Sequence, residues 1–313
     1  MTRYVGDAGH DDEQKRSIGM TQRFFLVDVF AQVPYSGNPL PVIVDESGLD
    51  DDVMQRIAAE LNYSETAFVD PAPATDGCYR IKLYTPAREI AFAGHPLLGA
   101  ARVIRDHVAG AGVPSIRLRL LQDSVDVTFE QAPDGGEVVW FRAPEVWPGA
   151  TLQPADIAPA VGLCAEDVAT ETPVQVFSAG TGAILVPLRN RRALEHCRLD
   201  LEAFAPLASA GFPPLVYLFC EASAEAPEDF RVRFFFEAHG AREDAATGNG
   251  AAFLAAYLAA NGGLPEPSRT LHIRQGDRIG RPSQVMLRIA RAVAGLDIRV
   301  GGRVVPIIEG HLV

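Results

Sequence analysis

The segment at 238–250 reads AHGAREDAATGNG, and it runs directly into the apolar residues AAFLAAYLAA of 251–260. A glycine-rich loop followed by small apolar residues predicts a helix that is buried on every side. Thr247 and Asn249 are its candidate N-caps, and Asn-Gly-Gly at 261–263 predicts its end. This pattern favours a core helix that begins in a tight loop.

Gly248 and Gly250 lie at the start of this helix, where a missing side chain lets another molecule approach the backbone. The first N–H groups of a helix have no partner within the helix, and the helix dipole is positive at that end. A carboxylate or a phosphate would therefore bind there. The alternative is a tight turn with no ligand, because a single glycine loop is weak evidence of a site.

The chain contains this segment twice. AREIAFAGHP at 87–96 aligns without a gap on AREDAATGNG at 241–250, and the Ala, Arg, Glu, second Ala and Gly are identical. A repeat spacing of about half the chain is too long for a solenoid and predicts two duplicated domains. The two helix N-termini would then face each other across a cleft. Equivalent positions are His95 with Asn249 and Ile90 with Asp244.

The length of 313 residues, 48% of them hydrophobic, suits two domains of ordinary size. We expect a disordered leader at 1–20, an N-terminal domain at 21–142 and a C-terminal domain at 143–299. Prolines at 144–154 mark the expected crossing between the domains. The last strand, within 300–313, is expected to return to the first domain.

Charge and composition exclude several classes of protein. The net charge of −12 and the lack of a basic cluster argue against nucleic acid as a partner. No apolar run is long enough to span a bilayer and no signal peptide is evident, which predicts a cytoplasmic protein. The cysteines are widely spaced, and no metal-ligand or nucleotide motif is present. We therefore expect no metal and no cofactor.

Glu65 and His95 are the candidate functional side chains of the first half. Glu65 falls in a predicted strand at 63–69 with the same parity as Ala67 and Val69, so it is expected to face the apolar side. Desolvation there would raise its pKa and suit it to proton transfer, whereas the alternative is an exposed glutamate. His95 stands where a helix begins, as a cap or as a hydrogen-bonding group for a ligand.

The motifs in order along the chain identify a family. They are DVF at 28–30, GNP at 37–39, SETAF at 64–68, FAGHP at 92–96 and EDAATG at 243–248. The sequence resembles the PhzF-like isomerases of phenazine biosynthesis, which are related in fold to diaminopimelate epimerase. This resemblance implies an α+β fold of two pseudo-symmetric domains, each a curved, mostly antiparallel sheet around a central helix.

The resemblance also implies an activity: a cofactor-independent isomerase that shifts a double bond by proton transfer in a small cyclic amino or hydroxy carboxylate. It makes Glu65 the general acid/base, and His95 and Asp244 its catalytic partners. Residues that bind the substrate would be Asn38, Gly94, Thr247, Gly248, Asn249 and Gly250. A homodimer with a place in secondary metabolism, such as antibiotic biosynthesis, is implied as well.

Several residues depart from the family pattern. Ala245 replaces a common proline, Asn249 a common serine and Leu97 a frequent threonine, so the substrate need not be the phenazine precursor. Diaminopimelate epimerase has a cysteine at each glycine loop, whereas these loops have none, which disfavours a two-thiol racemase. Epimerisation by Glu65 with Asp244 or His95 stays open, as does a ligand-binding protein without chemistry.

Overall fold

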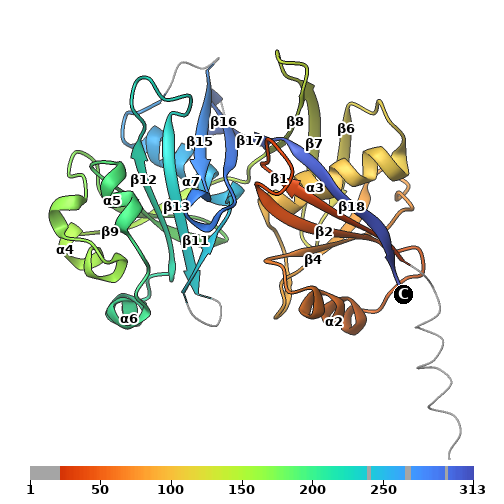
Figure 1. Ribbon diagram of the computed structural model, residues 1–313, viewed down its shortest axis with the longest axis horizontal. Helices are drawn as coiled ribbons and strands as arrows, with labels where there is room; N and C mark the ends of the chain where they lie inside the picture. The colour runs from red at the N-terminus through yellow and green to blue at the C-terminus, as the bar shows by residue number, and fades with distance from the viewer. Residues whose placement is uncertain (1–21, 238–240, 265–268, 293–294) are drawn as a thin grey trace, which may run out of the picture.

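The computed structural model describes residues 22–237, 241–264, 269–292 and 295–313. The expected leader at 1–20 lies outside this part. Residues 238–240, which begin the glycine-rich segment at 238–250, lie outside it as well. The described chain forms two lobes side by side, with the first half of the sequence in one and most of the second half in the other (Figure 1).

The first lobe is a strongly curved, mostly antiparallel sheet around one buried helix, α3. Its strands are β1 (Gln22–Val29), β2 (Asn38–Val44), β3 (Thr66–Val69), β4 (Tyr79–Tyr84), β5 (Glu89–Ile90), β6 (Ser115–Arg119), β7 (Ser124–Gln131) and β8 (Glu137–Arg142). Its helices are α2 (Asp51–Leu61), α3 (Gly94–Ile104) and a π-helical turn at Arg105–Ala109.

The second lobe repeats this arrangement around α7 (Gly248–Ala260). Its strands are β9 (Trp147–Leu152), β10 (Val174–Ala179), β11 (Thr181–Pro187), β12 (Leu215–Glu221), β13 (Phe230–Glu237), β14 (Ala241–Asp244), β15 (Thr270–Gln275), β16 (Ser283–Ala292) and β17 (Gly295–Gly302), while β18 (Val304–Leu312) follows them. Short helices are α4 (Pro154–Ile157), α5 (Arg191–His196) and α6 (Leu201–Ser209), with 3-10 turns at Pro159–Val161, Ala165–Asp167 and Asp277–Ile279.

The same strand pairings recur in both lobes. β2 and β3 are parallel, as are β11 and β12, and the parallel pair β4 and β6 matches β13 and β15. One strand, β18, crosses back from the second half of the sequence to the first lobe. β18 pairs with β1 after β17 has paired with β8, and β9 pairs with β10 directly after β8. We propose the domain division at 142 and 143 on this basis, with β18 assigned to the first domain.

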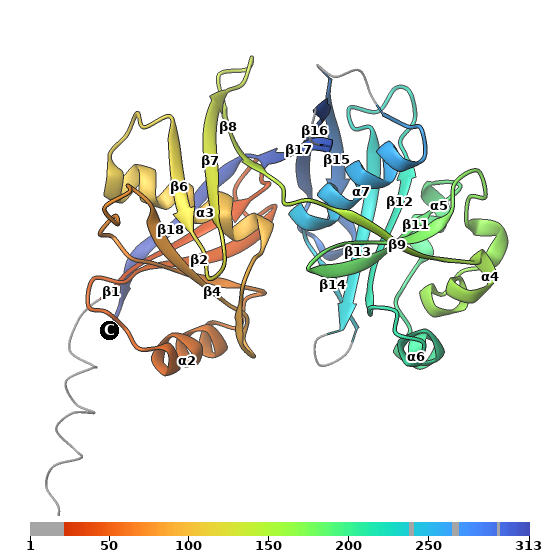
Figure 2. The ribbon, with the colours of Figure 1, turned by 180° about the vertical axis from the view of Figure 1, so that it is seen from behind.

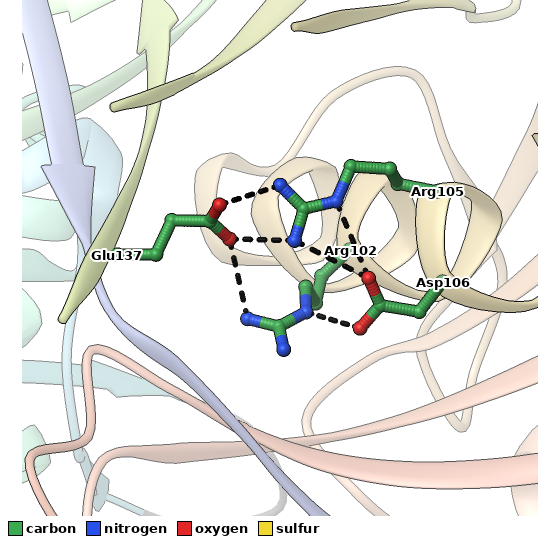
Figure 3. Close-up of polar contacts among 4 residues, drawn as sticks. All are labelled: Arg102, Arg105, Asp106 and Glu137. Atoms are coloured by element: carbon green, nitrogen blue, oxygen red, sulfur yellow. Dashed lines mark hydrogen bonds and ion pairs between the residues drawn. The ribbon is translucent and has the colours of Figure 1, made fainter. Parts of the chain in front are cut away.

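The two central helices are buried because they carry apolar or small residues on all sides. α7 has nine buried residues from Gly248 to Tyr257, and it packs against β9, β10, β11, β16 and β17 (Figure 2). α3 is held at its far end by ion pairs. Arg105 donates to both oxygens of Glu137 on β8 at 2.7 and 2.6 Å, and Arg102 pairs with Asp106 (Figure 3). These contacts fix the position of α3 along its axis.

Most elements follow the sequence pattern closely. Asp50 caps α2 by accepting from the Val53 N–H, and Asn62 ends it in the left-handed conformation at φ 54°, as the acidic start and the asparagine predict. The apolar runs at 24–29 and 42–44 fall in β1 and β2, as buried strands require. The α+β fold of two like domains is thereby confirmed.

Two local predictions were wrong. The strand after α2 begins at Thr66, so Glu65 lies just before it and the parity argument does not apply. Asn249 is not a cap, because α7 already begins at Gly248. The segment at 144–154, which stays the predicted crossing between the domains, also contains a strand that was not predicted, β9, whose backbone pairs with β10. The lead-in to each glycine loop is also a short strand, β5 and β14, which was not predicted.

Gly250 has a packing role that the sequence did not reveal. A Cβ built there would lie 2.4 Å from the ring of Tyr217, which is fully buried on β12. In the register of the first domain Ala67 occupies the place of Tyr217, because Ala67 pairs with Leu83 as Tyr217 pairs with Phe234. The large ring of the second domain therefore requires a glycine in the first turn of α7.

We predict that Gly250→Ala destabilises the protein by about 1–3 kcal/mol, because an overpacked core must shift the ring or the helix. The gain in helix propensity, at most about 1 kcal/mol, offsets only part of this cost. Urea unfolding of both proteins measures the difference. Gly310→Ala is the matched control, since a Cβ at Gly310 meets open space. Equal stability of the Gly250 and Gly310 variants would contradict this packing.

Candidate active site

The N-termini of α3 and α7 meet at two glycines. A Cβ on Gly94 would lie 3.2 Å from the Cα of Gly248, and a Cβ on Gly248 would lie 3.3 Å from the Cα of Gly94. The Asn249 backbone nitrogen is 3.4 Å from the same Gly94 position. A Cβ at these distances would be tighter than most real Cβ contacts, so glycine suits this approach best. Two sets of unpaired helix N–H groups, each at a positive dipole end, are thereby brought together.

Three titratable side chains surround this junction. Glu65 lies between α2 and β3, and one of its carboxylate oxygens is 3.6 Å from Nε2 of His95, the second residue of α3. Asp244 ends β14, four residues before α7 begins, and comes from the other domain. His95 is buried, and the Glu65 side chain is 20% exposed. The chain thus places an imidazole and two carboxyl groups at one site.

Asp244 is held by donors from both domains. Asn38, at the start of β2, donates from Nδ2 to Oδ1 of Asp244 at 2.9 Å and to the Ala246 carbonyl at 2.9 Å. The Thr247 hydroxyl donates to Oδ2 of Asp244 at 2.6 Å instead of capping α7. Gln275 is buried and donates from Nε2 to the Asp244 carbonyl at 3.1 Å and to the Thr247 hydroxyl at 3.0 Å.

Burial sets the protonation of these groups. It raises the pKa of Glu65, and it raises the pKa of Asp244 to about 6, with a further contribution from the negative charge of Glu65. Burial also lowers the pKa of His95 to about 4, although the nearby Asp244 opposes the change. The imidazole is therefore neutral at pH 7. Its Nε2 has no hydrogen-bond partner in the described chain, which leaves it available to a ligand.

The two domains contribute unequal chemistry at equivalent places. Thr66 pairs with Tyr84 in β4, and Val216 pairs with Phe235 in β13, so Leu215 in the second domain takes the place of Glu65. The partner of Leu83 is Ile90, whereas the partner of Phe234 is Asp244. Each domain thus contributes one carboxyl group to the site, Glu65 or Asp244, but from positions that are not equivalent. The site has no internal two-fold symmetry.

A second junction ties the domains together beside the site. Arg281, from the loop between β15 and β16, donates to a carboxylate oxygen of the buried Asp28 at 2.5 Å. The same guanidinium donates to the carbonyls of Gly37 at 2.9 Å and Ser36 at 2.8 Å. The Gly37 N–H donates in return to the Pro282 carbonyl at 3.0 Å. These bonds fix the loop from which Asn38 reaches Asp244.

The structure brings the predicted site residues into one region. Glu65, His95, Asp244, Asn38, Gly94, Thr247, Gly248 and Asn249 lie at or beside the junction of the helices, and Gly250 lies in the same first turn of α7, packed against Tyr217. Sequence reasoning missed Gln275 and Arg281, because neither belongs to a repeated motif. Among the described residues no group of three or more His, Cys, Asp or Glu side chains could hold a metal ion.

Solved structures share this two-domain architecture. A PhzF-family phenazine biosynthesis protein of Bacillus anthracis is similar with a TM-score of 0.84 at 23% identity, over 94% of this chain and 99% of its own. A predicted epimerase of Pseudomonas aeruginosa is similar with a TM-score of 0.77 at 31% identity, over 93% and 99%. A hydroxyproline epimerase of Agrobacterium vitis has the same fold at a TM-score of 0.64 and 11% identity.

Sequence comparison gives the family directly. The model of the phenazine biosynthesis-like proteins matches residues 27–310, and the chain belongs to this family. The trans-2,3-dihydro-3-hydroxyanthranilate isomerase of Pseudomonas aeruginosa is 34% identical over 292 residues, which is 92% of this chain and 98% of that protein. An uncharacterised isomerase of Mesorhizobium japonicum is 31% identical over 299 residues, 93% and 99% of the two chains.

These relatives make the protein an isomerase, as the resemblance of its motifs predicts. The alternative of a ligand-binding protein without chemistry is set aside. In the described part of the chain no helix is both long and apolar enough to span a bilayer.

We predict that the free energy of unfolding of the His95→Gln variant falls less, as the pH is lowered, than that of the unmodified protein. Because the pKa of His95 is about 4 in the folded protein and about 6.5 unfolded, the unfolded chain binds more protons between these values. Lowering the pH from 7 to 4 therefore reduces the free energy of unfolding by on the order of 3 kcal/mol through His95. Chemical unfolding at several pH values measures it. His311→Gln, an exposed control, should follow the unmodified protein, and identical slopes for His95→Gln would refute the prediction.

Proposed function

We propose that the enzyme shifts a double bond by proton transfer in a small cyclic carboxylate that bears an amino or a hydroxy group. The observation that carries this proposal is the convergence of Glu65, His95 and Asp244 at the paired N-termini of α3 and α7. A carboxyl group with a raised pKa both accepts and returns a proton near neutral pH.

The proposed reaction has two proton steps at one carboxylate. Glu65 in its ionised form takes a proton from a ring carbon, and the electron pair of that C–H bond moves into conjugation and shifts the double bond. Protonated Glu65 then returns the same proton to the carbon at the far end of the conjugated system. Substrate and product are isomers, so no other reactant is required.

The other residues orient the substrate and hold its charge. The free N–H groups of α3 and α7, with Gly94 and Gly248 at their ends, suit a substrate carboxylate and the charge that develops during transfer. Neutral His95 would bond through its unpaired Nε2. Asp244, fixed by Asn38 and Thr247, suits an amino or hydroxy group as an acceptor.

The family relationship supports the substrate class. Trans-2,3-dihydro-3-hydroxyanthranilate, named in a relative that is 34% identical, is a cyclic carboxylate with an amino and a hydroxy group. We propose a compound of this class as the substrate, and secondary metabolism as the setting. The substrate would differ from that of the relative because Asn249, Ala245 and Leu97 depart from the family pattern. A cofactor-independent, cytoplasmic homodimer is part of the same proposal.

Epimerisation is the second candidate, because Asp244 has a raised pKa and comes from the opposite domain. Glu65 and Asp244 would then act on opposite faces of one carbon. Three observations weigh against it. Asp244 is engaged by Asn38 and Thr247, the equivalent of Glu65 in the second domain is Leu215, and both glycine loops lack a thiol.

We predict that Glu65→Gln keeps binding and loses turnover by about 10²- to 10⁴-fold, the usual contribution of a positioned acid/base. Trans-2,3-dihydro-3-hydroxyanthranilate is the probe, with isomerisation followed by absorbance and binding by calorimetry. Glu60→Gln, on the exposed face of α2, is the matched control and should retain full activity. Full activity of Glu65→Gln would remove the carboxylate from the mechanism.

Turnover in D₂O distinguishes the two candidates. An epimerase labels the carbon that it inverts with solvent deuterium, whereas a double-bond shift through one carboxyl group carries the original proton across. We predict that the product of a single turnover retains most of its transferred hydrogen, as measured by mass spectrometry. Complete deuteration at an inverted carbon, with the double bond unmoved, would favour epimerisation.

A further inference from the structure

A cavity unrelated to the helix junction opens on the second domain, between α5, β13 and the turn after β15. It measures about 350 Å³ and is lined by Arg191, Leu194, Glu195, Arg231, Val232, Arg233, Arg274, Asp277 and Arg278. Neither Glu65, His95 nor Asp244 lines it. The cavity and the helix junction lie on opposite sides of β14. Glu243 and Asp244 are consecutive in this strand, so their side chains point to opposite faces of the sheet. Glu243 pairs with Arg233 of the cavity, while Asp244 faces the helix junction.

The charge of this lining is opposite to that of the protein. The chain has 28 basic and 40 acidic residues and a net charge of −12. The cavity gathers five arginines against two acids in its lining, Glu195 and Asp277, and two further acids, Glu243 and Glu228, pair with Arg233 and Arg231, which leaves an excess of one positive charge. A local excess of positive charge in an acidic protein attracts anions to that one place.

The arginines on the strands are fixed by buried acids beneath them. Arg233 donates to both oxygens of Glu243 at 3.0 and 2.6 Å and also to the Cys197 carbonyl at 2.5 Å. Arg231 pairs at 2.5 Å with Glu228, which is buried. These two guanidinium groups are therefore held in place before any ligand arrives, and the acids that neutralise them are covered.

The remaining arginines keep donors that no described residue uses. Arg191 bonds Glu195 through Nε alone, and Arg274 bonds Asp277 through Nε and Nη2. Arg278 has no hydrogen bond or ion pair with the described chain. Free N–H groups from α5, β15 and the Asp277–Ile279 turn thus surround one cavity.

We propose that this cavity binds a small polyanion, a metabolite that carries at least two oxyanion groups of the phosphoryl or carboxylate type. A volume of about 350 Å³ falls at the lower end of small-molecule sites. Guanidinium groups pair with such oxyanions through parallel N–H bonds. The site is separate from the proposed catalytic one, and its occupancy does not depend on the reaction there.

Calorimetric titration with pyrophosphate and with citrate, at constant ionic strength set by NaCl, tests the proposal. We expect one saturable site per chain, and at ten times the Kd a rise in Tm of about 2 °C or more. Arg278→Ala and Arg191→Ala should each weaken binding about 10-fold, the scale of a lost charge-assisted bond. A preference for pyrophosphate or citrate identifies the type of oxyanion.

Two further variants separate this cavity from other sites. Arg117→Ala removes an exposed arginine that is paired with Asp126 in the first domain, and it should leave the Kd unchanged. Asn249→Asp places a negative charge at the N-terminus of α7 and would abolish anion binding at the helix junction. The proposal fails if no saturable binding occurs at 5 mM, a concentration roughly at the millimolar limit of specific affinity. It also fails if Asn249→Asp abolishes binding while the Arg278 and Arg191 variants retain it.

Discussion

The contact between Gly94 and Gly248 is the constraint on which the structure depends. Two helices that enter separate domains meet end to end with no side chain between them. A Cβ at either place would press on the backbone of the other helix, so that the two helix ends would have to shift slightly apart. Other contacts in the fold hold the elements around this junction in place. The ion pairs of Arg105 and Glu137 hold one helix, and the bonds of Arg281 to Asp28 hold the loop that spans the domains.

Duplication has been followed by divergence in chemistry more than in form. The strand pairings of the two domains agree, while equivalent positions carry different side chains: Glu65 and Leu215, Ile90 and Asp244, His95 and Asn249, Ala67 and Tyr217. Differences in packing compensate each other locally, since the large ring of Tyr217 fills the space that Gly250 leaves open. Chemical differences do not compensate, and they leave a site whose two sides carry different functional groups.

The sequence predicts those features that rest on local pattern or on repetition. The repeated glycine loops predict the two buried helices, and Asp50 and Asn62 predict the ends of α2. Pattern alone did not decide whether Glu65 is exposed or functional; the family motif around it did. Gln275 and Arg281 could not be predicted, because their partners lie 31 and 253 residues away in sequence and are brought near only by tertiary folding. Their roles and those of the other site residues remain predictions.

The return of β18 to the first domain has a consequence for how the protein is made. β1 is completed on one side by β2 and on the other by β18, which follows the strands of the second domain in the sequence. During synthesis the first domain leaves the ribosome with β1 as an open edge and keeps it until residues 304–312 have emerged. An open apolar edge strand is prone to pair with other chains. The half that is translated first is thus completed only after the other half has been synthesised.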